Sequence, residues 1–245
     1  MHSFVQLWVY LSATPLFGLT ATLVVYVLAQ GAYIRLGQAA WANPVLWTVI
    51  VLAGGLMLIG VPYPTYFSGA QFIHFLLGPA VVALGWPLWQ RRAELRTRWR
   101  RLLVAAVAGG TAASGSAVLL AMVLELPMDV SLSLVPKSVT APVAMGIAEK
   151  IGAIPALAAV FAVVTGLVGA LAGKYLFDGL RIGKTPAGWA IRGFALGTAA
   201  HGIGAARALQ VNSDAGAYAG LALGLQVVLA SVLIPLAFRL IQSWP

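Results

Sequence analysis

The chain has 245 residues, of which 61% are hydrophobic and only 9% are charged, and it contains no cysteine. An average soluble domain carries about 25% charged residues, so this composition excludes an ordinary soluble domain, and the lack of cysteine excludes disulfide and thiol chemistry. The net charge of +9 does not indicate a nucleic-acid partner, because six of the fifteen basic residues lie in one short segment, Arg91–Arg101. Such a segment is typical of a cytoplasmic loop in a membrane protein.

Long apolar runs recur along the chain without the strict alternation that transmembrane strands require. A spanning helix needs about 20 apolar residues, and several runs reach that length. We therefore predict an all-α integral membrane protein in the lipid bilayer, with residues 1–245 forming a single polytopic domain.

In the first half, the apolar runs predict four spans, and the stretch between the second and the third predicts a turn. The spans are residues 4–29, Pro44–Ile59, Phe72–Trp89 and Leu102–Leu126, and the turn is Val61–Gln71. The third span contains Gly78 and Pro79, and we expect it to be broken there. The arginine segment precedes the fourth span and is predicted to be a loop.

In the second half, three further apolar runs predict spans, and a basic loop, Lys174–Arg192, separates the first two of them. The spans are Ile154–Leu176, Gly193–Leu209 and Tyr218–Leu240. Including these, we expect about seven spanning helices. The segment Leu132–Lys150 remains between the fourth and fifth spans.

The segment Leu132–Lys150 carries a lysine and two prolines at membrane depth. Irregular backbone survives there only beside protein or a water-filled cavity, so we expect this segment to form a functional site and not a purely structural element. If it crosses fully, the basic loop Lys174–Arg192 falls outside the cell. If it is re-entrant, twelve of the fifteen basic residues are cytoplasmic, and the positive-inside rule favours this second layout.

Proline-broken segments occur in both halves of the chain, Phe72–Trp89 and Leu132–Ala148. Such a pair points to a transporter built from inverted repeats with a site near the middle of the membrane. The likeness between the two is confined to the proline-containing break, so sequence alone does not establish a repeat.

The first candidate site is an anion site around Pro136 and Pro142. A proline can start a half-helix inside the membrane, and its N-terminus offers free N–H groups and partial positive charge. Lys137 adds a full charge, and the hydroxyls of Ser138 and Thr140 can donate to a carboxylate. The alternative, of about equal weight, is that Lys137 reaches to the membrane surface and the prolines only kink a helix.

The second candidate is the glycine-rich run GTAAHGIGAARAL, with His201 and Arg207 in an apolar stretch. Their spacing of six residues does not place them on one helical face, so joint action requires a break between them. Here too an alternative has equal weight: a tightly packed helix with His201 bonded internally and Arg207 at the membrane surface. No catalytic constellation and no cluster with metal-ligand spacing is apparent, so we expect neither an enzyme nor a metal or cofactor.

Four runs resemble the LrgB/CidB family, in the expected order over roughly residues 20–240. They are FLLGPAVVALGWPLWQ, SLVPKSVTAPVAM, GAIPALAAVF and ALGTAAHGIGAARAL. The resemblance implies that the site residues lie in these motifs. Those carried over are Pro136, Lys137, Ser138, Val139, Thr140 and Pro142, then Thr198, His201, Gly202, Gly204 and Arg207, with Gly78 and Pro79 in the first half.

The resemblance implies two functions. Bacterial members are described as antiholin-like regulators of murein hydrolases that act with a small membrane partner of the LrgA/CidA type, and a plastid member moves glycolate and glycerate. Our leading hypothesis is a carrier of small 2-hydroxy or 2-oxo monocarboxylates, such as glycolate, glycerate or pyruvate, and the antiholin-like regulator is the alternative. We expect a multi-pass protein of the bacterial inner membrane, with a homo-oligomer as a further expectation.

Overall fold

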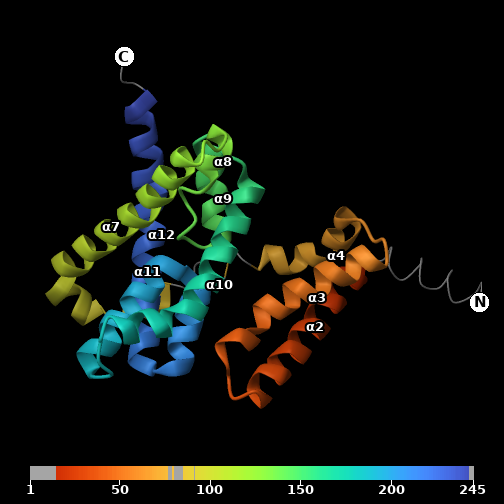
Figure 1. Cartoon of the computed structure of the whole chain (residues 1–245), viewed down its shortest axis with the longest axis horizontal. Helices are drawn as coiled ribbons and strands as arrows, with labels where there is room; N and C mark the ends of the chain where they lie inside the picture. The colour runs from red at the N-terminus through yellow and green to blue at the C-terminus, as the bar shows by residue number, and fades with distance from the viewer. Residues whose placement is uncertain (1–14, 77–78, 80–84, 91, 243–245) are drawn as a thin grey trace, which may run out of the picture. The chain divides into compact units, whose positions relative to one another are not determined.

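The computed structural model (Figure 1) describes residues 15–76, 79, 85–90 and 92–242, and every regular element in that part of the chain is a helix. The all-α class is therefore confirmed. Four of these helices are long and apolar enough to cross a bilayer: Leu16–Arg35, Arg96–Val123, Pro155–Gly179 and Ser213–Ile241. The apolar helix α3 (Pro44–Leu58) is shorter, at 15 residues.

The chain divides into two compact units, residues 1–82 and 83–245. The first contains α2 (Pro15–Arg35), η1 (Ala40–Ala42), α3 and α4 (Tyr63–Phe75). Residues 1–14, where the first span was predicted to begin, lie outside the described part. So does most of the predicted break in the third span, including Gly78, while the described Pro79 is exposed.

The predicted turn Val61–Gln71 is wrong over most of its length, because α4 begins at Tyr63. A proline is tolerated in the first turn of a helix, where its missing N–H has no partner to lose, and Pro64 occupies that turn. Close packing holds α4 against α2: a Cβ on Gly18 would lie 2.1 Å from the carbonyl oxygen of Tyr66. Thr22 Oγ1 and the Tyr66 hydroxyl are also hydrogen-bonded, at 2.7 Å.

The second unit holds the remaining helices. They are α6 (Gly85–Gln90), α7 (Arg92–Val123), α8 (Met128–Ser133), α9 (Ala141–Lys150), α10 (Pro155–Gly179), α11 (Pro186–Val211) and α12 (Ser213–Gln242). Two predicted loops are shorter than expected. The arginine segment is helical from Arg92 onward, and the basic loop is reduced to residues 180–185.

Helix α7 continues through the arginine segment because arginine, leucine and glutamate all favour helix. Its 32 residues make a rod about 48 Å long, against a hydrocarbon core of about 30 Å. The arginine-rich N-terminal end of α7 therefore extends beyond the apolar layer while remaining regular helix.

The segment between α7 and α10 returns to the place where it began, and we call residues 128–153 the first hairpin. Ser133, at the end of α8, accepts a hydrogen bond on Oγ from the N–H of Ile154 at 3.0 Å, just before α10 begins. Between them the chain runs through turns 134–140 and returns as α9, whose ten residues span only about 15 Å. This geometry agrees with the predicted re-entrant layout.

Helix α11 folds back on itself at His201, and we call residues 186–211 the second hairpin. His201 has φ 41° and ψ −134°, a non-helical conformation between two helical limbs. A Cβ on Gly204 would lie 2.8 Å from the carbonyl oxygen of Leu196, although these residues would be about 12 Å apart along a straight helix. The predicted span Gly193–Leu209 is therefore a bent pair of limbs.

The two hairpins come from opposite ends of α10 toward the same part of α7. The first is closed at the beginning of α10, and the second follows its end. Along α10, Gly173, Gly169 and Gly166 face Leu196, Ala200 and His201 in turn. On α7, Ser114 donates to the carbonyl of Val135 in the first hairpin at 2.7 Å, and Gly109 faces Thr198 in the second. Gly109 and Ser114 are about 7.5 Å apart along the axis of α7.

Candidate functional site: the tips of two hairpins

The tip of the first hairpin is the N-terminus of α9. Thr140 is the N-cap in extended conformation, but its side chain makes no capping hydrogen bond, and Pro142 lies in the first turn. The prolines explain the break locally: Pro136 cannot donate to a preceding turn, and Pro142 suits a helix start. The predicted half-helix N-terminus is thus present, and its first N–H groups are left with partial positive charge.

Three hydroxyls predicted to bind a ligand are buried without a hydrogen-bond partner: Ser138 Oγ, Thr140 Oγ1 and Thr198 Oγ1. Ser138 and Thr198 are each only 5% exposed. A buried polar group without a partner costs about 1–3 kcal/mol, so water or a ligand bonded to these hydroxyls would stabilise the fold. Both hairpins contribute, since Ser138 and Thr140 belong to the first and Thr198 to the second.

The tip of the second hairpin is held by His201. Its side chain is 4% exposed, and Nε2 lies 2.7 Å from the carbonyl oxygen of Ala162 in α10. The ring thus fixes the bend against α10, and the second limb begins with Gly202, beside which there is open space. The predicted break is present, at His201 itself, and the internally bonded histidine matches the alternative interpretation of this side chain.

Around the centre of α7 lie polar contacts that sequence reasoning missed. A Cβ on Gly109 would lie 2.9 Å from Thr198 Cγ2, and one on Gly110 would lie 2.8 Å from Gln226 Oε1. Gln226, on α12, is 4% exposed and donates to the Ala106 carbonyl at 2.6 Å. The available signals were the polar run GGTAASGS inside an apolar span and a lone glutamine in the last one.

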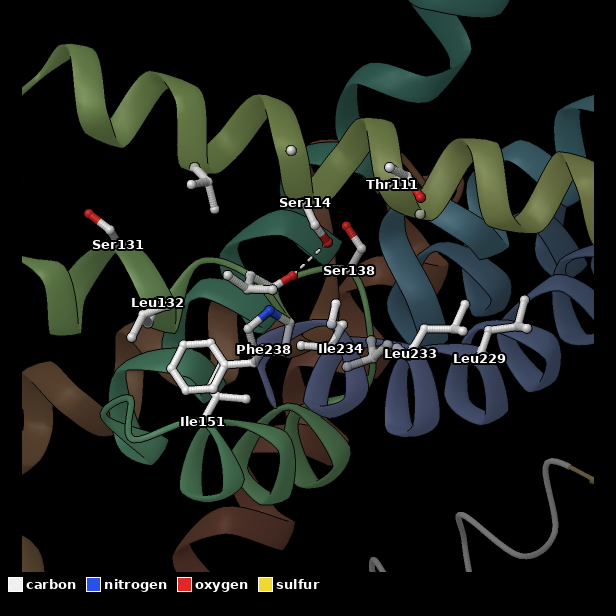
Figure 2. Close-up of a pocket in the computed structure, with 18 of the residues that line it drawn as sticks. Thr111, Ser114, Ser131, Leu132, Ser138, Ile151, Leu229, Leu233, Ile234 and Phe238 are labelled. Carbon is white, nitrogen blue, oxygen red and sulfur yellow. Dashed lines mark hydrogen bonds between the residues drawn. The ribbon is translucent and has the colours of Figure 1, made fainter. Parts of the chain in front are cut away.

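A cavity of about 580 Å³ opens beside the first hairpin, between α7 and α12. Of the predicted site residues, Pro136, Ser138 and Val139 line it. Figure 2 shows Thr111, Ser114 and Ser138 together on one side of the cavity and the apolar side chains of α12 on the other. The cavity is therefore a mostly apolar chamber with hydroxyls gathered along one wall.

Lys137 is partly buried, and its side chain makes no hydrogen bond or ion pair within the described part of the chain. It lies between the buried Pro136 and the buried, unpartnered Ser138. The charge of Lys137 thus belongs to the same turn segment as the hydroxyls of Ser138 and Thr140.

Arg207 does not line this cavity. It lies on the second limb of the second hairpin and lines a separate, smaller cavity with Lys174, Lys184 and Arg192. Gly204 packs between Ala200 and Leu196, so its role is close approach of the two limbs. The structure therefore groups Pro136, Ser138 and Val139 at one cavity wall, brings Thr198 to the same part of α7, and separates Arg207 from them.

The arrangement suits a small anion. Two half-helices, α9 and the limb 202–211, have their N-termini at the hairpin tips, and helix N-termini attract negative charge. Unpartnered hydroxyls can donate to a carboxylate or a neighbouring oxygen. No group of three or more metal-binding side chains occurs among the described residues.

Residues 22–240 match the model of the LrgB-like family. The uncharacterized protein YwbG of Bacillus subtilis is 34% identical over 87% of this chain and 93% of its own length. The holin-like protein CidB of Staphylococcus aureus is 30% identical over 89% of this chain and 93% of its own. No solved structure matches the chain.

Proposed function

Because this chain belongs to the LrgB-like family and its two hairpins carry buried hydroxyls without hydrogen-bond partners, we propose that it is a membrane carrier of small monocarboxylates. The observation that carries the proposal is the burial of Ser138, Thr140 and Thr198 without partners. Native proteins leave few such groups, and three of them on two hairpins are best explained by a ligand.

In this proposal the carboxylate binds beside Lys137 and the N-terminus of α9. The hydroxyls of Ser138, Thr140 and Thr198 then donate to the carboxylate or to a 2-hydroxy or 2-oxo oxygen. Small acids such as glycolate, glycerate or pyruvate carry both groups within a few bonds, which fits donors on two tips. Movement of the hairpins with their neighbouring helices would expose the site alternately to the two sides.

The proposed setting is the bacterial inner membrane, as a multi-pass protein. The arginine-rich end of α7 and the loop 180–185 would face the cytoplasm under the positive-inside rule. The first hairpin would then enter from the outer side and the second from the cytoplasmic side, which is the arrangement of inverted repeats.

The test is uptake of labelled pyruvate, glycolate and lactate into proteoliposomes, with and without a pH gradient. We expect saturable uptake that Lys137→Ala abolishes. The matched control is Lys150→Ala, which removes an exposed lysine at the other end of α9 and should leave uptake near wild type. Thermal unfolding of each variant in detergent checks that the protein is folded. Wild-type uptake in folded Lys137→Ala would contradict the site.

A second candidate is a holin-like or antiholin-like role with a small LrgA/CidA-type membrane partner. The observation that favours it is the similarity to relatives described as holin-like CidB proteins. It predicts no saturable uptake by the folded protein alone. Co-reconstitution with an LrgA-type protein, followed by a solute-leakage assay, would then show whether the activity depends on the partner.

A further inference from the structure

A second cavity, of about 120 Å³, lies where α10, the loop 180–185, both limbs of the second hairpin and the beginning of α12 meet. Four basic side chains line it: Lys174, Lys184, Arg192 and Arg207. Its lining shares no residue with the larger cavity beside the first hairpin. A ligand site in this smaller cavity therefore does not depend on the proposed carrier function.

Arg192 forms a fixed cationic wall of this cavity. It is 7% exposed, its Nη2 pairs with Asp178 Oδ1 at 2.7 Å, and its Nε donates to the carbonyl of Ile182 at 3.0 Å. The guanidinium also lies over the rings of Phe177 and Trp189, at 5.6 and 5.5 Å from their centroids. Nη1 is left without a hydrogen bond in the described part of the chain, so an oriented donor remains for a ligand.

Lys174 and Lys184 supply movable charge at the rim. Both are exposed, and neither side chain makes a hydrogen bond or an ion pair with the described residues. Both lie near enough to Asp178 to act on it electrostatically, so that carboxylate has cations on several sides. An incoming anion thus meets two ammonium groups without an ion pair among the described residues, of which Lys174 lies over the Tyr175 ring at 5.9 Å. It also meets the guanidinium, against one carboxylate that already has a partner.

The surroundings of the cavity indicate a lipid. Large apolar side chains close to it in the sequence are more than half exposed: Tyr175, Leu176, Leu180, Leu209 and Val211. The cavity also lies at the C-terminal end of α10, a helix that is long and apolar enough to span a bilayer, and phosphate headgroups sit at the ends of such helices. Basic pockets between membrane helices at this depth suit anionic headgroups, and the exposed apolar residues suit acyl chains.

We propose that this cavity binds the phosphate group of an anionic phospholipid. The phosphate oxygens accept from Arg192 Nη1 and pair with Lys174 and Lys184, while Phe177 and Trp189 hold the guanidinium in place. The acyl chains then lie along the exposed apolar side chains of α10 and the second hairpin.

The experiment is a thermal-unfolding titration of the full chain in neutral detergent with phosphatidylglycerol, phosphatidylcholine or inorganic phosphate. The apparent affinity follows from the rise in Tm with ligand concentration. We expect phosphatidylglycerol to raise Tm and phosphatidylcholine to leave it unchanged. Lys174→Gln with Lys184→Gln should weaken phosphatidylglycerol binding about 25-fold, about fivefold for each lysine.

The charge-matched control is Lys150→Gln with Arg239→Gln, which removes two exposed basic residues outside this cavity. The affinity of this control variant for phosphatidylglycerol should stay within about twofold of the wild-type value. Equal stabilisation by phosphatidylcholine, or equal losses in the two double variants, would overturn the proposal. Stabilisation by inorganic phosphate that disappears in the lysine variant would support the phosphate site and assign it to a soluble anion.

Discussion

The first hairpin reverses its direction over residues 134–140, whereas the second reverses at His201 alone. In the first, two prolines prevent regular helix, and two hydroxyls have no hydrogen-bond partner. In the second, glycines let two helical limbs lie in direct contact, and a buried histidine fixes the bend. The first hairpin thus carries two of the three unpartnered hydroxyls, and the second depends more on close packing.

This difference extends to the glycines of the two hairpins. A Cβ on Gly197 in the second would lie 2.1 Å from the carbonyl oxygen of Ala219 in α12, while one on Gly146 in α9 would meet nothing within 4 Å. Substitutions should therefore affect stability mainly in the second hairpin and ligand binding mainly in the first.

The largest expected effect is that of Gly197→Ala. The added methyl group forces α11 and α12 apart, and we expect a loss of about 3 kcal/mol in the free energy of unfolding, at the upper end for overpacking. Gly146→Ala is the matched control and should be neutral or stabilise by up to about 1 kcal/mol, because alanine favours helix. Thermal unfolding in detergent measures both. Equal Tm values for the two variants would remove the contrast between the hairpins.

An intermediate effect is expected at His201, where φ is 41°. A non-glycine residue held in such a conformation costs about 1–3 kcal/mol, and a β-branched residue costs most. His201→Val should therefore destabilise by about 2 kcal/mol, since it also loses the contact with Ala162. His201→Gly relieves the backbone strain and should remain closer to wild type in the same unfolding assay. A valine variant more stable than the glycine variant would contradict the bend.

The smallest stability effects are expected from two serines of the first hairpin. Ser133 donates a hydrogen bond to the carbonyl of Asp129 at 2.6 Å and accepts one from the N–H of Ile154 at 3.0 Å. Ser133→Ala should therefore lower the free energy of unfolding by about 1 kcal/mol. Ser138 has no partner, and Ser138→Ala should cost nothing or stabilise slightly while it weakens uptake. The reverse order in the unfolding assay would show that Ser138 is a structural residue.

The sequence predicted the first hairpin well because prolines act on their own backbone. Pro136 and Pro142 remove backbone donors wherever they stand. The charge count also favoured re-entry, but it treated residues 193–209 as a span, and the reversal at His201 shows that they are not one. The second hairpin was predicted only as a break, because glycines permit a reversal without requiring one. Its direction depends on contacts such as Gly204 with Leu196, which no local pattern reveals.

Other differences have equally specific causes. The arginine segment was expected to be a loop, but its charges only required exposure to water, and a helix longer than the bilayer provides that. Arg207 was grouped with the hydroxyls because it shares a motif with Thr198. The reversal at His201 carries it away from them and into the basic cavity. Gln226 went unnoticed because one amide barely changes the hydropathy of a long apolar helix.

The short limbs of the hairpins have a consequence for how this protein is made. A segment needs about 20 apolar residues to settle in a bilayer by itself, and neither α9 nor either limb of α11 has that length. The second hairpin also packs Gly193 and Gly197 against Ala215 and Ala219, which follow it in the chain. Its docking must therefore wait until the ribosome has delivered α12, so the part of the protein most dependent on close packing is completed near the end of synthesis.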